Sequence, residues 1–424
     1  MRPGIGLFAL MADGKVNQLV IVKTPSVVIA QQLIMDETLG ERLQKLGDES
    51  HWLKAAERPE ITRNNLIQAI EMARAYYLNH QKLDGNFIYA MDISNGETIQ
   101  KDNQVRQAGA LWGLACLNRD RFNEPNRRAL LLGIDFFASR VTPLQNGEKC
   151  FIYPNDTTIN TGTVALFALT LIEFLHGQKK FIDEKTRQKY TELLDIHLSF
   201  LRSQEMDDGS WSRDYNPETN SKPFQSSPYY DGEALLAYCK AARYLERTDL
   251  MERINNAIPK LIAKYTIQAW EKDAESDEAK GFYQWGCMAF AEYVEAGWQP
   301  HANLVSNAAY ALSWWQIHSN QIEYRLGNTA YAVEGLVATY QIAKQNGDTA
   351  RQEKLKEVIL RMMSSLMTWQ YKGPFMRFNP VLDHLKAYPG SDGGIVSAKG
   401  STLVRIDTHQ HQTHAMLLML KHLF

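Results

Sequence analysis

The chain has 424 residues, with 46 lysines and arginines against 48 aspartates and glutamates, and a formal net charge of −2 at pH 7. This balance provides no basic stripe for a phosphate backbone, so we expect no nucleic-acid partner. No apolar run approaches the ~18 residues of a membrane helix, so we also expect no membrane span. Aromatic residues make up 10% of the chain, a content that favours sites that stack sugars.

The first 60 residues differ in pattern from the rest. Their start resembles a signal peptide, but it lacks the basic region and the small-residue cleavage site of one. The run GLFALMADGKVNQLVIV instead predicts two short strands around an Asp-Gly turn. We therefore predict a short N-terminal α/β segment over residues 1–60 and one toroidal catalytic domain over 61–424. These features favour the cytoplasm, with the periplasm as the alternative.

From about residue 64 onward, apolar residues recur at helical spacing almost throughout. The pattern predicts helices near 64–80, 104–119, 126–140, 158–176, 184–204, 230–246, 248–268, 281–296, 301–318, 328–346, 350–370 and 408–423. Short breaks with helix stop and start signals alternate with longer breaks that hold glycine, aromatic and acidic residues. The longer breaks cover 81–103, 141–157, 205–229 and 371–407.

Twelve helices form six αα-hairpins, and such pairs must stack on their neighbours to bury both faces. Six pairs can close into a ring with short turns on one side and long loops around a cleft on the other. We therefore predict an all-α fold, an (α/α)6 toroid with a short N-terminal β-hairpin, and an open solenoid as the alternative.

Four cysteines, Cys116, Cys150, Cys239 and Cys287, show no CxxC spacing, so we expect buried free thiols. The chain also lacks a P-loop, a dinucleotide fingerprint, a Gly-x-Ser-x-Gly elbow and a metalloprotease signature. We therefore expect no cofactor.

Two helix starts combine polar residues with apolar runs. In KDNQVRQAGALWGL, Asn103 is a candidate N-cap, and Arg106 lies in the first turn, where a cation opposes the helix dipole. Arg106 should therefore have an anionic partner, either a neighbouring aspartate or a substrate carboxylate. In YPNDTTINTGTVALFAL, Asp156 is a candidate cap or a substrate ligand.

The turn SQEMDDGSWSRDY, residues 203–215, follows a helix and begins a long loop. Weaker echoes occur at 81–92 and 391–400. QEMDDGSW resembles the QW-type repeat of terpene-cyclase toroids, in which it is a structural clasp. Asp207, Asp208 and Trp211 therefore hold the loop, or one of them lines the substrate groove.

Aromatic and acidic side chains meet at two further helix starts. In SSPYYDGEALLAY, the pair Tyr229 and Tyr230 precedes Asp231 and Glu233 in a helix that begins at Pro228. This is our leading candidate site, although the helix dipole alone also favours acids there. In GFYQWGCMAFAEY, the side chains of Gln284 and Trp285 suit a sugar ring or ordinary core packing.

The last helix begins with LVRIDTHQHQTHAMLLML, which gathers Arg405, Asp407, His409, His411 and His414. We expect a hydrogen-bonded network in the cleft, part of it catalytic, or capping and packing. Because neither HExxH nor a cysteine pair is present, we predict no metal site.

These residues resemble six-hairpin glycosidase-like enzymes and, over 200–424, the C-terminal domain of D-glucuronyl C5-epimerases. VRIDTHQHQTH is similar to that family's Arg-x-Asp-Tyr-His motif at Arg405, Asp407 and His409. The family's tyrosine, expected in proton transfer, is Thr408 here. YYDGEALLAY and NTAYAVEGLVATY, which begins at Asn328, correspond to helix starts of that domain, and the resemblance makes Asn328 a candidate substrate ligand.

The expected function is that of a carbohydrate-active enzyme acting on a poly- or oligosaccharide. A glycoside hydrolase needs a carboxyl pair, and we favour Glu233 or Asp231 against Asp407. A uronate C5-epimerase or lyase would use a base such as Tyr230 or His411, with Arg106 as the carboxylate clamp. A terpene-cyclase-like toroid or a non-catalytic glycan-binding toroid is the remaining alternative.

Overall fold

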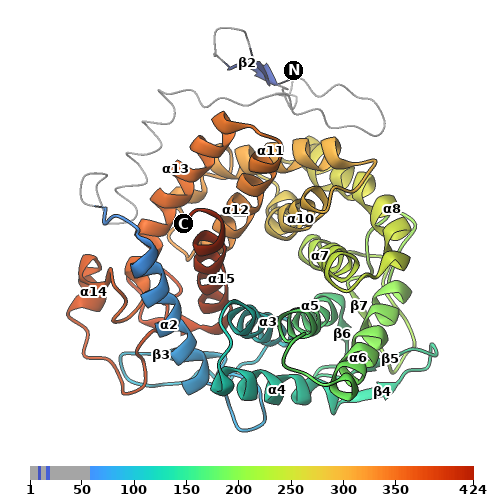
Figure 1. Cartoon of the computed structure of the whole chain (residues 1–424), viewed down its shortest axis with the longest axis horizontal. Helices are drawn as coiled ribbons and strands as arrows, with labels where there is room; N and C mark the ends of the chain where they lie inside the picture. Colours follow the sequence, from blue (N-terminus) through green and yellow to red (C-terminus); the bar gives the residue numbers. More distant parts are fainter. Residues whose placement is uncertain (1–7, 11–15, 20–57) are drawn as a thin grey trace.

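The computed structural model describes residues 8–10, 16–19 and 58–424. Figure 1 shows their helices as two concentric rings. The inner ring comprises α3 (Gln104–Asp120), α5 (Thr161–Gly177), α7 (Pro228–Tyr244), α10 (Asp277–Glu295), α12 (Ala330–Gln345) and α15 (Ile406–His422). Each inner helix packs on the next, and α15 closes the ring on α3. The predicted (α/α)6 toroid is therefore confirmed.

The outer ring alternates with the inner one along the chain. It comprises α2 (Arg63–Asn79), α4 (Glu124–Ala138), α6 (Glu184–Ser203), α8 (Met251–Ile262), α11 (Ala302–His318) and α13 (Thr349–Leu366). A π-helical segment (Ala263–Gln268) and α9 (Ala269–Lys272) prolong α8. Because each inner helix follows an outer one, the inner helices run parallel and their N-termini lie at one end of the ring. All the predicted helical segments are present.

Burial separates the two rings. Nearly every residue of α5 is buried, because its sequence TGTVALFALTLIEFLHG is apolar on all sides. A helix of that kind needs neighbours all around it, which only the inner ring provides. In α4 the buried residues form one face, and the other face is charged.

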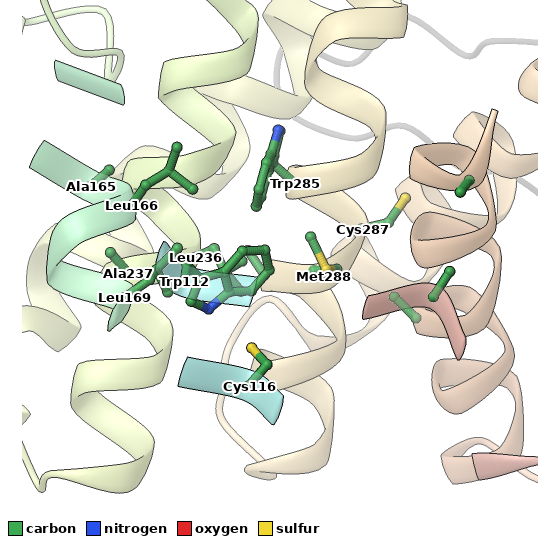
Figure 2. Packing of buried hydrophobic residues seen from close by; sticks show 14 of the residues in the cluster. Trp112, Cys116, Ala165, Leu166, Leu169, Leu236, Ala237, Trp285, Cys287 and Met288 are labelled. Carbon is green, nitrogen blue, oxygen red and sulfur yellow. The ribbon is translucent and has the colours of Figure 1, made fainter. Parts of the chain in front are cut away.

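Large aromatic side chains fill the axis of the ring. Figure 2 shows Trp112 of α3 between the inner helices, near Trp285 of α10. Their ring centroids lie 5.3 Å apart, and the imidazole of His414 lies 4.5 Å from Trp112. The toroid is thus a packed core and not an open pore. The four cysteines are buried and free, as predicted.

Short strands tie together the loops that precede the inner helices. Strand β3 (Ala90–Asp92) pairs with β8 (Leu403–Arg405), so it joins the loop before α3 to the loop before α15 where the ring closes. Strand β6 (Ile159–Asn160) pairs with β7 (Asp214–Tyr215), and β4 (Val141–Pro143) pairs with β5 (Lys149–Phe151). The minor elements are α14 (Pro380–Asp383) and 3₁₀ turns at Thr248–Leu250, Ile322–Tyr324, Met367–Trp369 and Met376–Phe378.

The predicted N-terminal strand pair is present as β1 (Phe8–Leu10) and β2 (Val16–Leu19), which are antiparallel. The Asp-Gly turn between them lies outside the described residues, and the domain boundary at residue 60 stays a prediction. In the described part of the chain, no helix combines the length and apolar character needed to cross a membrane.

Candidate active site

A cleft with a volume of about 530 Å³ opens at the N-terminal ends of the inner helices. It is lined mainly by the first turns of α3, α7, α10, α12 and α15, which the parallel arrangement brings to one place. Predicted site residues that line it are Arg106, Tyr229, Tyr230, Glu233, Gln284, Trp285, Asn328, Arg405, Asp407 and His411.

Helical spacing explains which residues of α15 face the cleft side. Asp407, His411 and His414 follow one another at i, i+4 and i+7, so they share one face of the helix. His409 lies on the opposite face, fully buried, with its Nε2 3.1 Å from the carbonyl of Ala73. Burial lowers the pKa of His409 to about 3. His409, predicted as a substrate ligand, is therefore a neutral packing residue outside the cleft.

Glu334 of α12 connects two histidines of α15. Its Oε2 accepts a hydrogen bond from Nδ1 of His411 at 2.9 Å, and its Oε1 accepts from Nδ1 of His414 at 2.6 Å. The amide of Gln284 also donates to Oε2. The carboxyl group is fully buried, so these contacts replace its water. Because Nδ1 of His411 is held in this way, Nε2 is the nitrogen left to accept a proton.

Glu233 of α7 is the second titratable group of the cleft. It is almost fully buried, and among the described residues its Oε2 has no hydrogen-bond partner. Burial raises the pKa of this carboxyl well above its usual value. Gly162 of α5 makes room for it, since a Cβ there would lie 2.4 Å from Oε2. A carboxyl group with a raised pKa and an unpartnered buried oxygen in a cleft is a strong candidate for acid–base chemistry.

Asp407 lies between two arginines. Arg405 contacts it through Nε at 2.5 Å and Nη2 at 2.9 Å, and Nε of Arg106 lies 3.1 Å from Oδ2. Burial opposes ionisation, but the hydrogen bonds and charge of Arg405, with Arg106, hold the pKa of Asp407 below its usual value. Asn103 caps α3 as predicted. Of the two predicted partners of Arg106, the structure contains the neighbouring aspartate.

Two predicted acids form contacts elsewhere. Asp231 is fully buried beside Glu233, but its Oδ1 accepts from the backbone nitrogen of Trp211 at 2.8 Å and its Oδ2 from the hydroxyl of Tyr265. Asp156 accepts from Gln104 at 2.5 Å and does not cap α5, whose N-cap is Asn160. Neither residue lines the cleft.

The turn at 203–215 is a clasp and not a wall of the cleft. The Nζ of Lys264 lies 3.0 Å from Asp208, and Lys260 donates to the carbonyl of Asp207 at 2.9 Å. Trp211 is buried, with its ring centroid 5.5 Å from that of Tyr238. Asp208 and Trp211, predicted as substrate ligands, thus tie this loop to its neighbouring helices, as the structural alternative expected.

Several cleft residues were missed from the sequence. They include Lys280, Arg325, Tyr331 and Gln410. Glu334, which holds His411 but does not itself line the cleft, was also missed, and its signal was a single acid in the apolar run AYAVEGLVA. No three histidine, cysteine, aspartate or glutamate side chains within the described ranges converge as metal ligands would.

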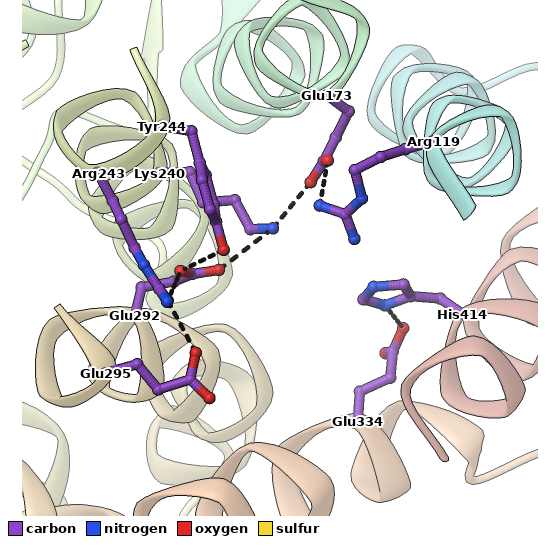
Figure 3. A network of polar contacts seen from close by, with 9 residues as sticks. All are labelled: Arg119, Glu173, Lys240, Arg243, Tyr244, Glu292, Glu295, Glu334 and His414. Atoms are coloured by element: carbon purple, nitrogen blue, oxygen red, sulfur yellow. Dashed lines mark hydrogen bonds and ion pairs between the residues drawn. The ribbon is translucent and has the colours of Figure 1, made fainter. Parts of the chain in front are cut away.

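At the opposite end of the inner ring, charged side chains form a floor (Figure 3). Glu173 accepts from Lys240 at 2.8 Å and also pairs with Arg119. Glu292 lies 3.3 Å from Lys240 and 2.6 Å from Arg243. The cations lie near the C-terminal ends of inner helices, where the dipole favours positive charge. These ion pairs join α3, α5, α7 and α10 at the end of the ring opposite the cleft.

Solved structures share this ring of helices. A D-mannose isomerase matches with a TM-score of 0.59 and 12% identity, over 85% of this chain and 98% of that chain. A cellobiose 2-epimerase from Bacillus thermoamylovorans matches with a TM-score of 0.60 and 14% identity over the same shares. An unsaturated glucuronyl hydrolase from Streptococcus agalactiae matches with a TM-score of 0.54 and 10% identity, over 94% and 98%.

No family model and no curated protein matches the sequence. At the identities of the structural matches, the likeness establishes the fold and leaves the chemistry to the site. The chain therefore has the (α/α)6 fold of the six-hairpin glycosidase-like enzymes, as predicted from its helical pattern.

Proposed function

We propose that this chain is a carbohydrate-acting enzyme that moves a proton at a sugar carbon, as an epimerase or isomerase does. The observation that carries the proposal is the imidazole of His411 in the cleft, with its Nδ1 held by buried Glu334. A base oriented by a carboxylate is the arrangement that proton abstraction requires. Two fold neighbours, D-mannose isomerase and cellobiose 2-epimerase, are named for reactions of this class.

The proposed reaction uses the two titratable groups as base and acid. Nε2 of His411 takes the proton of a C–H bond next to a carbonyl group, and the electron pair of that bond moves toward the carbonyl oxygen. Glu233, whose neutral form burial favours, then supplies a proton to carbon. The electron pair returns from the oxygen to form the new C–H bond, and Glu233 is left as a carboxylate. An imidazole oriented by a carboxylate and a buried carboxyl group suit this division of roles.

Hydrolysis, the function favoured by the sequence, is the second candidate. It is supported by the raised pKa of Glu233 and the lowered pKa of Asp407, which match a general acid and a carboxylate base. Both oxygens of Asp407 are engaged by Arg405, however, and one also by Arg106. A carboxylate held in this way is a weaker base, so we rank proton transfer first.

The test is incubation with neutral and acidic mono- and oligosaccharides in D₂O, followed by proton NMR and a reducing-end assay. We expect deuterium to replace a carbon-bound proton without new reducing ends. His411→Asn should abolish the exchange, and the control His176→Asn, at an exposed position on α5, should retain it. New reducing ends without exchange would identify a hydrolase, and exchange that survives His411→Asn would remove His411 as the base.

A further inference from the structure

The cleft concentrates positive charge in a protein that is slightly acidic. Its lining includes four cationic side chains, Arg106, Lys280, Arg325 and Arg405. The acids of the lining are Asp407 and Glu233, and burial raises the pKa of Glu233, which favours its neutral form. The whole chain carries a formal net charge of −2, so composition does not explain this concentration.

Two of these cations have no buried carboxylate partner in the part of the chain that the structure describes. Nζ of Lys280 lies 3.8 Å from Asp277, whose side chain is 97% exposed. A solvent-exposed pair of that kind contributes little. Arg325 donates through Nε and Nη2 to the backbone carbonyl of Asn320, a neutral group, at 3.2 and 3.1 Å. By contrast, Arg106 and Arg405 are neutralised in part by Asp407.

Lys280 and Arg325 border aromatic side chains. Tyr229 packs beside Gly281, the residue after Lys280, where a Cβ would lie 2.9 Å from the tyrosine ring. The ring of Tyr331 lies 6.4 Å from that of His411 and also lines the cleft. Both cations therefore line the same cleft as these two tyrosines and the proposed base.

The helix dipoles add to the positive potential that these side chains create in the cleft. The inner helices turn their N-termini toward the cleft, and these ends carry partial positive charge. Lys280 lies in the first turns of α10, where a cation opposes the dipole of its own helix. A cation retained there without a strong protein partner suits a negatively charged ligand.

We propose that Lys280 and Arg325 form a subsite for an anionic group of the sugar substrate, a carboxylate or a phosphate ester. Tyr229 and Tyr331 flank the sugar ring in this subsite. The inference rests on the proposed action on carbohydrates and adds the class of substrate. It assigns recognition of the anion to Lys280 and Arg325, because Arg106 is already paired with Asp407.

The test compares binding of D-glucuronate, D-glucose 6-phosphate and D-glucose by isothermal titration calorimetry at low salt. We expect at least one anion to bind ~10-fold more tightly than glucose, as charge-assisted hydrogen bonds allow. Lys280→Gln and Arg325→Gln should each reduce that preference, and the double variant should remove it. The control Lys272→Gln removes an exposed lysine of α9 and should keep the preference.

Each result decides a separate point. A preference for glucuronate identifies a uronic acid, and a preference for the phosphate identifies a sugar phosphate. Three results would overturn the subsite. They are equal binding of glucose and both anions, binding of neither anion, and a preference for an anion that survives the double variant. Anion-selective binding without proton exchange would contradict the proposed reaction alone, whereas exchange on neutral sugars without anion preference would contradict the subsite alone.

Discussion

Nδ1 of His411 lies 2.9 Å from Oε2 of Glu334, at the seam where α15 packs on α12. The other oxygen of the same buried carboxyl accepts from His414 at 2.6 Å. One carboxylate thus fixes the proton-bearing nitrogen of two imidazoles. This arrangement explains why an acid is tolerated in an apolar inner helix, and it fixes the orientation of the proposed base, which lines the cleft.

Glu334→Gln should lower the rate of substrate proton exchange by ~10²-fold or more, because the neutral amide no longer stabilises the charged imidazole. The ring packing should persist, since the side chains are of equal size. The rate is measured by NMR in D₂O, and circular dichroism checks the fold. Glu357→Gln, which changes an exposed carboxylate of α13, is the control. An undiminished rate in Glu334→Gln would contradict the assigned role.

Gly162→Ala, a change on the neighbouring helix α5, should displace side chains of the site. The added Cβ would lie 2.3 Å from the ring of Tyr230 and 2.4 Å from Oε2 of Glu233, so both side chains must move. We expect a large loss of kcat and ~1–3 kcal/mol of destabilisation from overpacking. Gly133→Ala in α4 is the control for overpacking away from the cleft, because its Cβ would lie 2.3 Å from the side chain of Leu111, so it should lose stability but keep kcat. Equal activity of the two variants would contradict this account of Gly162.

Asp407→Asn separates the two candidate reactions. If Asp407 only orients Arg106 and Arg405, the change should weaken substrate binding and lower the rate by ~10-fold, a loss of about 1.4 kcal/mol. If Asp407 is the base of a hydrolase, its loss should abolish turnover, as expected for a removed catalytic carboxylate. Steady-state kcat and KM on the sugar that the NMR assay identifies provide the measurement. We expect the partial effect, and a loss of kcat by several orders of magnitude without the weakened binding would favour hydrolysis.

The ring was predictable because helical periodicity and break lengths are local properties of the sequence. Whether a side chain near a helix start faces the cleft depends on the neighbouring helices, which the local sequence does not specify. Asp231 and Glu233 therefore looked equivalent in the sequence, although only Glu233 lines the cleft. Glu334 was missed for a related reason. Its partner His411 is 77 residues away in the chain, and only ring closure brings them together.

Asp231→Asn should change how stability depends on pH. Burial raises the pKa of Asp231 to about 7, against the hydrogen bonds from Tyr265 and Trp211, whereas the unfolded value is ~3.9. The folded state therefore binds more protons between these values, and the contribution of Asp231 to stability is lost as pH rises through that window.

Because asparagine does not titrate, the unfolding free energy of Asp231→Asn should rise relative to that of the wild type between pH 5 and 8. Urea unfolding at each pH gives this difference in unfolding free energy directly. The contribution of Glu233 to the pH dependence cancels, because both proteins contain Glu233. A difference that stays constant over this range would show that Asp231 keeps its charge when buried.

Glu173→Gln should destabilise the floor of the ring. The glutamate is buried and pairs with Lys240 at 2.8 Å and with Arg119. The change leaves these two cations without their shared carboxylate, so we expect a loss of ~3–5 kcal/mol in unfolding free energy. Glu124→Gln breaks an exposed pair with Arg128 on α4 and should cost ~0.5 kcal/mol or less. Urea unfolding compares the two variants, and similar small losses would mean that Lys240 and Arg119 find sufficient compensation from Glu292 and solvent.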